Sequence, residues 1–200
     1  GLYNIEDSKV DNPDVDKEAT LYLDAYGYAV AFEGKTSSAE DYLFVKALDT
    51  AYGDVSAKVV FFDGTQKTVD LDQITLANGT VEDVKWTENG GNSNNVAVNT
   101  VYKYTAGSSD YDLEVVSVKS ATSTTISNKN PSITGTGNNI VTDSQTVFVD
   151  VKNNKTWTGY KNVTNKTGAD VIAVYNSDNV ADVVFIYGTF SSSADDDDFV

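Results

Sequence analysis

The chain has 200 residues and is 40% hydrophobic, which suits one large domain or two small ones with an ordinary core. Thirty Asp and Glu face fourteen Lys and no Arg, and this net charge of −16 excludes nucleic acid and anionic membrane surfaces as partners. Without Cys or His the chain cannot form disulfides, use a thiol nucleophile or build a Ser-His-Asp triad.

The first apolar pattern follows an acidic stretch, residues 1–19, which we interpret as a linker or lead-in. The segment LYLDAYGYAVAFEG (21–34) alternates apolar and other residues on both sides of DAYG. Period-two alternation indicates strands, and Asp and Gly at the ends of DAYG are typical of a tight hairpin turn. This hairpin opens a first β-lobe that we predict to span residues 20–119.

Three further patterns complete the predicted first lobe. EDYLFVKAL (40–48) favours a strand over a short helix because Tyr, Phe and Val fit a pleated surface. VSAKVVFFDGTQKTVDL (55–71) contains the hairpin dipeptide Asp63–Gly64, and GTVEDVKWTE (79–88) predicts another strand. A last hairpin joins alternating residues 96–104 to 111–119 through TAGSSD.

Residues 120–139 are small and polar, and we expect a connector or long loop there. Two hairpins follow, at 145–163 and 169–190, so that residues 140–190 form a second β-lobe or complete the first. Residues 191–200 are an acidic tail expected to be mobile. The predicted fold is therefore all-β, with antiparallel hairpins forming a β-barrel or β-sandwich, possibly as two small lobes.

Catalytic and metal-binding residues are not singled out by the sequence. A pair of carboxylates for glycan hydrolysis would arise by chance among thirty acids, most of which lie at turns or on exposed strand faces. Asp11, Asp14 and Asp16, and the run 195–198, lack the spacing of a calcium hand. We expect no enzyme activity, no cofactor and no specific metal, with a structural calcium as the alternative.

The aromatic residues offer two interpretations. Tyr22 and Tyr26 around the first turn, and Trp157 and Tyr160 near the end, could stack on a sugar. The same rings fit equally as cross-strand partners inside a sheet, which is the interpretation we favour. A covalent Lys–Asn cross-link is a further hypothesis for Lys46 and Lys58, which lie within apolar strands, although Lys58 shares its face with Ser56 and so points to solvent.

The segments LYLDAYGYAVAFE, DYLFVKAL and AKVVFFDGTQKTVDL resemble surface-layer proteins of Gram-positive gut bacteria, in which a strand reading YLDxYGxV precedes a VxFxDGT hairpin. TVFVDV, TWTGYKNV and ADVVFIYG are similar to the closing elements of the same proteins. Thr164 stands where those proteins usually have Pro. The resemblance covers roughly residues 20–188 and its motifs are hairpins, so it specifies no active site.

The resemblance implies a segment of an exported protein of the cell wall or S-layer, and the absence of Cys and His fits an exported bacterial protein independently. Its partners would be other surface-layer subunits or cell-wall polymers, reached through helical S-layer homology repeats outside this chain. We therefore predict a non-catalytic structural or display module located at the extracellular surface. The alternative is an adhesin module that binds a glycan or a host protein through exposed Tyr and Trp.

Overall fold

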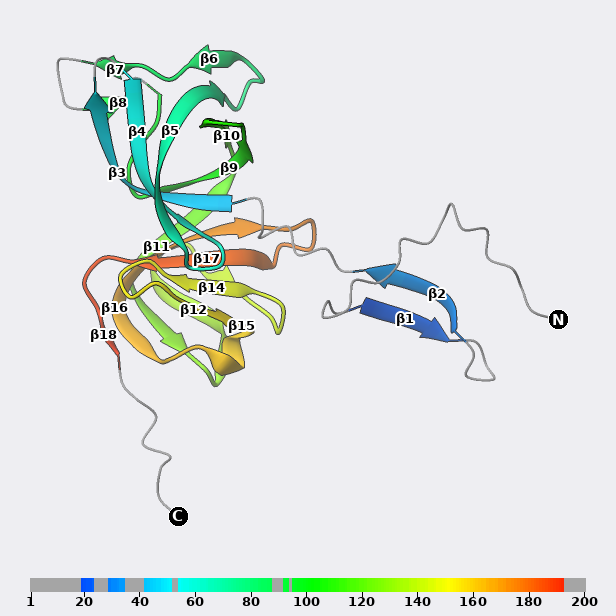
Figure 1. Cartoon of the computed structure of the whole chain (residues 1–200). Coiled ribbons are helices and arrows are strands. Elements are labelled where there is room, and N and C mark those ends of the chain that lie inside the picture. The colour runs from blue at the N-terminus through cyan, green and yellow to red at the C-terminus, as the bar shows by residue number, and fades with distance from the viewer. Residues whose placement is uncertain are drawn as a thin grey trace. The chain divides into compact units, whose positions relative to one another are not determined.

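The computed structural model in Figure 1 describes residues 19–23, 29–34, 42–51, 54–87, 92–93 and 95–192. The chain divides into two compact units, Gly1–Ser37 and Ser38–Val200. In the first unit, β1 (Ala19–Leu23) pairs antiparallel with β2 (Ala29–Gly34), with Leu21 opposite Phe32. This pairing confirms the first predicted hairpin, whose turn, residues 24–28, lies outside the described residues. Most of the predicted linker at 1–19 and of the predicted tail at 191–200 also lies outside them.

The second unit begins with a barrel that we call lobe 1. Its strands are β3 (Tyr42–Ala51), β4 (Asp54–Phe61), β5 (Gln66–Thr75), β6 (Val81–Asp83), β9 (Thr100–Ala106) and β10 (Asp110–Val115). They follow the order β10-β9-β3-β4-β5-β6, and β10 also pairs with β5 in parallel, which closes five strands into a barrel. A short ladder joins β7 (Trp86–Thr87) to β8 (Asn92–Ser93). Counted along the chain, the barrel strands follow the Greek-key order 1-2-3-5-4 of the OB-fold, a topology that does not by itself specify a function.

The remaining strands form a curled sheet that we call lobe 2. Its elements are β11 (Val118–Ser127), β12 (Asn130–Gly137), β13 (Ile140–Val141), β14 (Val147–Asp150), β15 (Lys155–Thr158), the 3-10 turn η2 (Tyr160–Asn162), β16 (Lys166–Tyr175), β17 (Ala181–Tyr187) and β18 (Ser191–Ser192). The order is β13-β12-β11-β16-β17-β14-β15, and β18 pairs with β16. Among the residues that the structure describes, no helix is long and apolar enough to cross a bilayer.

The two lobes share one connectivity. In lobe 2, β11 pairs with both β12 and β16, just as β3 pairs with both β4 and β9 in lobe 1. The hairpin β16–β17 corresponds to β9–β10, and β17 runs parallel to β14 as β10 runs parallel to β5. Lobe 2 differs in that no ladder joins β12 to β14 within the described part of the chain. The all-β prediction is confirmed, with a parallel pair in each lobe among the antiparallel hairpins.

Residues 120–139, for which the sequence predicts a connector or long loop, instead form most of β11 and β12. Their inward positions are occupied by few apolar residues, Ala121, Ile126 and Ile133, so the alternation is hidden among Ser and Thr. Thr is nevertheless a good strand residue because its β-branched side chain fits a pleated surface. The link between the lobes is therefore only Val116 and Ser117.

Alternating side chains fill three cores. Leu43, Val59 and Phe61 lie in the lobe 1 core, while Phe148, Val171 and Ile186 lie in the lobe 2 core. Residues of opposite parity on the same strands form a third cluster, the shared core, in which the two lobes meet; it comprises Phe44, Val60, Val101, Val149, Val151, Ile172, Val174, Val183 and Phe185. Strands buried on both faces read as continuous apolar runs, and this explains sequences such as LFV and VVFI.

The Asp63–Gly64 turn joins β4 to β5 as predicted. Gly64 has φ 79°, and the amide N–H of Thr65 donates to Asp63 Oδ1 at 2.8 Å. A Cβ at position 64 would also approach the Asn154 carbonyl oxygen to 3.2 Å, so glycine is required here by both backbone and space. The turn therefore lies against the β14–β15 turn of lobe 2.

Candidate functional site

Of the four aromatic residues considered as the alternative glycan-binding set, the structure describes the side chains of two. Tyr22 lies in β1, but its side chain is outside the described residues, as is the whole of Tyr26. Trp157 lies in β15 and Tyr160 begins η2, so the two rings are near each other in the sequence. Both are half-buried and pack against the lobe 2 core.

Trp157 has a partner within the protein. The Lys166 ammonium lies 5.1 Å from the centre of the Trp157 ring and 4.6 Å from that of Phe190. A cation this close to a ring is attracted by the ring's electrons, most strongly where water is excluded. The indole therefore helps to cover a buried charge.

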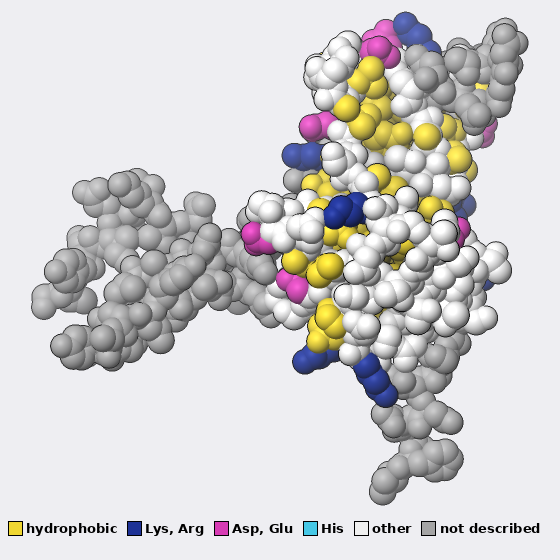
Figure 2. All heavy atoms as spheres, turned by 180° about the vertical axis from the view of Figure 1, so that it is seen from behind, with side chains coloured by type: hydrophobic (Ala, Val, Ile, Leu, Met, Phe, Trp, Pro, Cys, Tyr) yellow, Lys and Arg dark blue, Asp and Glu magenta, His cyan; other side chains and the backbone are white. Residues whose placement is uncertain are grey.

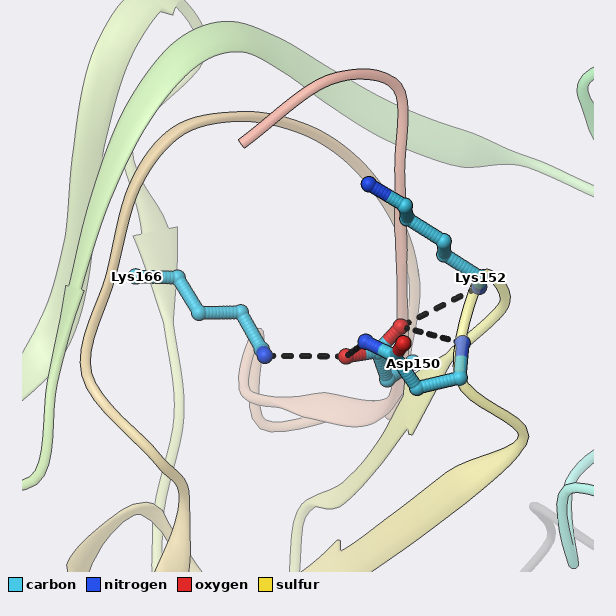
Figure 3. A network of polar contacts seen from close by, with 4 residues as sticks. Asp150, Lys152 and Lys166 are labelled. Atoms are coloured by element: carbon cyan, nitrogen blue, oxygen red, sulfur yellow. Dashed lines mark hydrogen bonds and ion pairs between the residues drawn. The ribbon is translucent and has the colours of Figure 1, made fainter. Parts of the chain in front are cut away.

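The charge beneath these rings belongs to a buried ion pair, shown in Figure 3. Lys166 Nζ lies 2.8 Å from Asp150 Oδ2, and the side chains are 2% and 1% exposed. Asn153 Nδ2 donates to the same Oδ2 at 2.9 Å. The other carboxylate oxygen, Oδ1, accepts the backbone N–H groups of Lys152 at 3.1 Å and Asn153 at 3.0 Å. Both oxygens of Asp150 thus have two donors each.

This environment sets the charge state of Asp150. Burial by itself raises the pKa of the carboxyl group, but the hydrogen bonds from Lys166 and Asn153, together with the positive charge of Lys166, hold it below its ordinary value. Asp150 is therefore ionised at neutral pH and paired with the Lys166 ammonium. Removing either partner would leave an uncompensated charge in the protein interior.

Local sequence explains how the pair is assembled. Asp150 ends β14 two residues after Phe148, so it shares the inward face of that strand. Lys166 begins β16 and is opposite Ile126 of β11 and Ser192 of β18. An Asp at an inward position of the apolar run TVFVDV was a usable signal in the sequence, but nothing near Lys166 marks it as buried.

The two lysines considered for a cross-link have other surroundings. Lys58 is exposed, as its face predicts, and Lys46 is half-buried. Lys46 Nζ donates to Gln66 Oε1 and to the Val151 carbonyl oxygen, each at 3.1 Å. Lys46 also lines a hollow of about 440 Å³ with Phe44, Asn99, Lys152, Asp170 and Tyr187. Burial, and then the negative charge of Asp170, raise the pKa of Tyr187 in this hollow.

Acidic side chains line a second hollow in lobe 1. It measures about 450 Å³ and is bordered by Asp54, Ser56, Asp70, Leu71, Asp72, Ser109 and Asp110. Asp54, Asp70 and Asp72 are exposed, and Asp70 Oδ1 accepts the Ser56 hydroxyl at 2.6 Å. Across the described ranges, no three acidic side chains are arranged to hold a metal ion. Among the described residues that line this hollow, the side chains are acidic or hydroxyl-bearing except for Leu71.

The face shown in Figure 2 carries acidic and basic side chains at several places, among uncharged polar and hydrophobic groups. Comparison with known proteins adds nothing to this description, because no family model, no curated protein and no solved structure matches the chain.

Proposed function

We propose that this chain is a non-catalytic structural or display module of a bacterial cell-surface protein. The observation that carries the proposal is that several aromatic rings and the buried charged pair are occupied in packing. Phe44, Phe148 and Phe185 are fully buried, and the buried Asp150 and Lys166 are paired with each other. Trp157 covers that pair, so its ring is only partly available to a ligand.

The shared core supports a mechanical role. Phe44 from β3 stacks on Phe185 from β17, with ring centres 5.7 Å apart, and Phe44 also contacts Tyr187 at 5.2 Å. Apolar side chains that join two lobes resist their separation because pulling them apart exposes that surface to water. A module that spaces or displays other domains needs this resistance more than it needs a cleft.

The charge of the chain fits the same role. A net charge of −16 keeps densely arranged surface proteins soluble and attracts cations without a specific site. The partners in this proposal are neighbouring surface-layer subunits or cell-wall polymers. The motifs of residues 20–188 that resemble surface-layer proteins agree with this assignment.

Immunogold labelling tests the location directly. Antibodies raised against residues 42–192 are expected to label intact cells of the organism that encodes the chain. A cytoplasmic protein of the same cells, which antibodies reach only after permeabilisation, provides the comparison. Labelling of the chain that also requires permeabilisation would contradict the proposal.

A glycan-binding role is the second candidate, favoured by the partial exposure of Trp157 and Tyr160 in lobe 2. If these rings bind sugar, Tyr160→Ala should abolish the binding signal of the chain on a glycan array, because the sugar can no longer stack on the tyrosine ring. Tyr104→Ala in lobe 1 is the matched control, since Tyr104 is also half-buried but packs on Phe61 at 5.1 Å. Equal signals from the unsubstituted chain, Tyr160→Ala and Tyr104→Ala would exclude Tyr160 as a glycan-binding residue.

A further inference from the structure

The pair Asp150–Lys166 has the features of a reactive pair as well as those of an ion pair. An amine nitrogen lies 2.8 Å from a carboxyl oxygen in a nearly water-free position. Two ordered groups held in contact react far faster than the same groups in solution, because their entropy of approach has already been lost. Amide formation between them would release one water molecule and needs no other reactant.

We propose that Lys166 and Asp150 condense to an intramolecular isopeptide bond between Nζ and Cγ. This inference stands on the geometry of the pair and is independent of the proposed surface role.

The first step is a proton transfer within the pair. One proton moves from the Lys166 ammonium to Asp150 Oδ2, which leaves a neutral amine beside a neutral carboxylic acid. Two buried charges disappear in this step, which removes the cost of keeping both ions in the protein interior. The resting state is the ion pair, so the reactive form is a minor one and the bond forms slowly after folding.

The second step is the attack of the Lys166 lone pair on Asp150 Cγ. The electrons of the C–O double bond move onto Oδ1, which becomes an oxyanion. The backbone N–H groups of Lys152 and Asn153 already point at Oδ1, at 3.1 and 3.0 Å, and so would stabilise the charge that develops there. Figure 3 shows the backbone nitrogen of Lys152 on the far side of the carboxylate from the Lys166 nitrogen.

The last step expels water. A second proton moves from the Lys166 nitrogen to the hydroxyl at Oδ2, the bond from Cγ to Oδ2 breaks, and the double bond to Oδ1 forms again. Asn153 Nδ2, 2.9 Å from Oδ2, donates to the departing oxygen. The products are a neutral amide and one water molecule, so atoms and charge balance. The rings of Trp157 and Phe190 cover the site and slow the reverse hydrolysis.

Such a bond would join the end of β14 to the start of β16. These two strands are not neighbours in the sheet, because β17 lies between them. The bond would close a loop that holds β15 and η2, so that neither could detach from lobe 2 when the sheet is pulled or heated.

Intact mass measured on the purified full chain tests the proposal. The folded protein is expected to weigh about 18 Da less than its sequence, the mass of one water. Lys58→Ala is the matched control: Lys58 is also a strand lysine but is exposed, and this variant should keep the deficit. Lys166→Arg keeps the positive charge but cannot form the amide, so it and Asp150→Ala should show their calculated masses.

Trypsin digestion locates the bond. Lys166 acylated on Nζ is not cleaved, so the digest should contain residues 130–152 joined to residues 162–200 as one branched peptide. A full calculated mass after days of incubation of the folded protein would overturn the proposal. A water deficit found within one unbranched peptide, as from a cyclic imide at Asp63–Gly64, would overturn it too, and so would a deficit that persists in Lys166→Arg.

Discussion

Replacing Phe185 by Ala probes whether the shared core makes one cooperative body of the two lobes. Phe185 is 0% exposed and stacks on Phe44 across the lobe boundary, with ring centres 5.7 Å apart and ring planes at 28°. Truncating a fully buried Phe costs about 3–5 kcal/mol, because both the transfer energy and a cavity are involved. With a urea dependence of about 2 kcal/mol per molar, the unfolding midpoint should fall by about 2 M.

The two tryptophans make the assay specific for each lobe. Trp86 packs against the lobe 1 core and Trp157 against the lobe 2 core, and they are the only tryptophans in the sequence. Trp157→Phe therefore leaves a probe in lobe 1, and Trp86→Phe leaves a probe in lobe 2. We expect both fluorescence transitions to coincide and to move together when Phe185→Ala is added to either background.

An exposed control substitution and a double-mutant cycle complete this experiment. Val81, which is 55% exposed, can be replaced by Ala as a matched truncation, and the shift should stay within about 0.5 kcal/mol. Combining Phe185→Ala with Phe44→Ala should give a total smaller than the sum, by about 0.5–1.5 kcal/mol for the lost ring pair. If Phe185→Ala shifts only the Trp157 transition and leaves that of Trp86 in place, the lobes unfold independently and the reasoning is refuted.

Two further predictions concern single positions. Gly159→Ala should lower the free energy of unfolding by about 1–3 kcal/mol more than Gly79→Ala does. Both glycines have φ near 80°, but only at position 159 would a Cβ meet a carbonyl oxygen, that of Ser144 at 2.8 Å. Equal losses of stability in thermal unfolding would contradict this prediction. Tyr102→Phe should cost about 1 kcal/mol at neutral pH, because the Tyr102 hydroxyl accepts the Ala97 N–H at 2.9 Å. Burial raises the pKa of Tyr102 above 10.0, so the folded state keeps this proton longer than the unfolded chain and its stability falls as pH rises past 10.0. The fall should be shallower in Tyr102→Phe, and parallel stability curves above that pH would contradict the assignment.

Local pattern was sufficient to predict the hairpins. In β4, the alternation of Val55, Ala57, Val59 and Phe61 places all four side chains in the lobe 1 core, as the sequence indicates. The same reasoning failed at β11 and β12, where Ser and Thr occupy half of the positions and only tertiary packing shows which face is inward. It could not give the parallel pairs β5–β10 and β14–β17 either, because strands distant in the chain are aligned by the closure of a sheet rather than by a turn.

Sequence pattern likewise predicts only one of the two residues of the buried ion pair. Asp150 could be assigned to the inward face from its position relative to Phe148. Lys166 could not, because it follows the polar run NVTN and is buried by Trp157 and Phe190, which come from other parts of lobe 2. The apolar strands around Lys46 and Lys58 made these two lysines the candidates instead. The side chain of Lys58 lies on the outer face of its strand and is exposed.

Polysaccharide turnover tests the central claim, that the lobes form a structural body whose exposed acidic groups catalyse no reaction on a glycan. The full chain, incubated with a panel of bacterial, plant and host glycans, is expected to release no reducing ends above buffer. Asp70 and Asp110, paired across β5 and β10 in the acidic hollow, identify the carboxylates to test. Turnover that disappears in Asp70→Asn or Asp110→Asn would contradict the claim and identify the hollow as an active site.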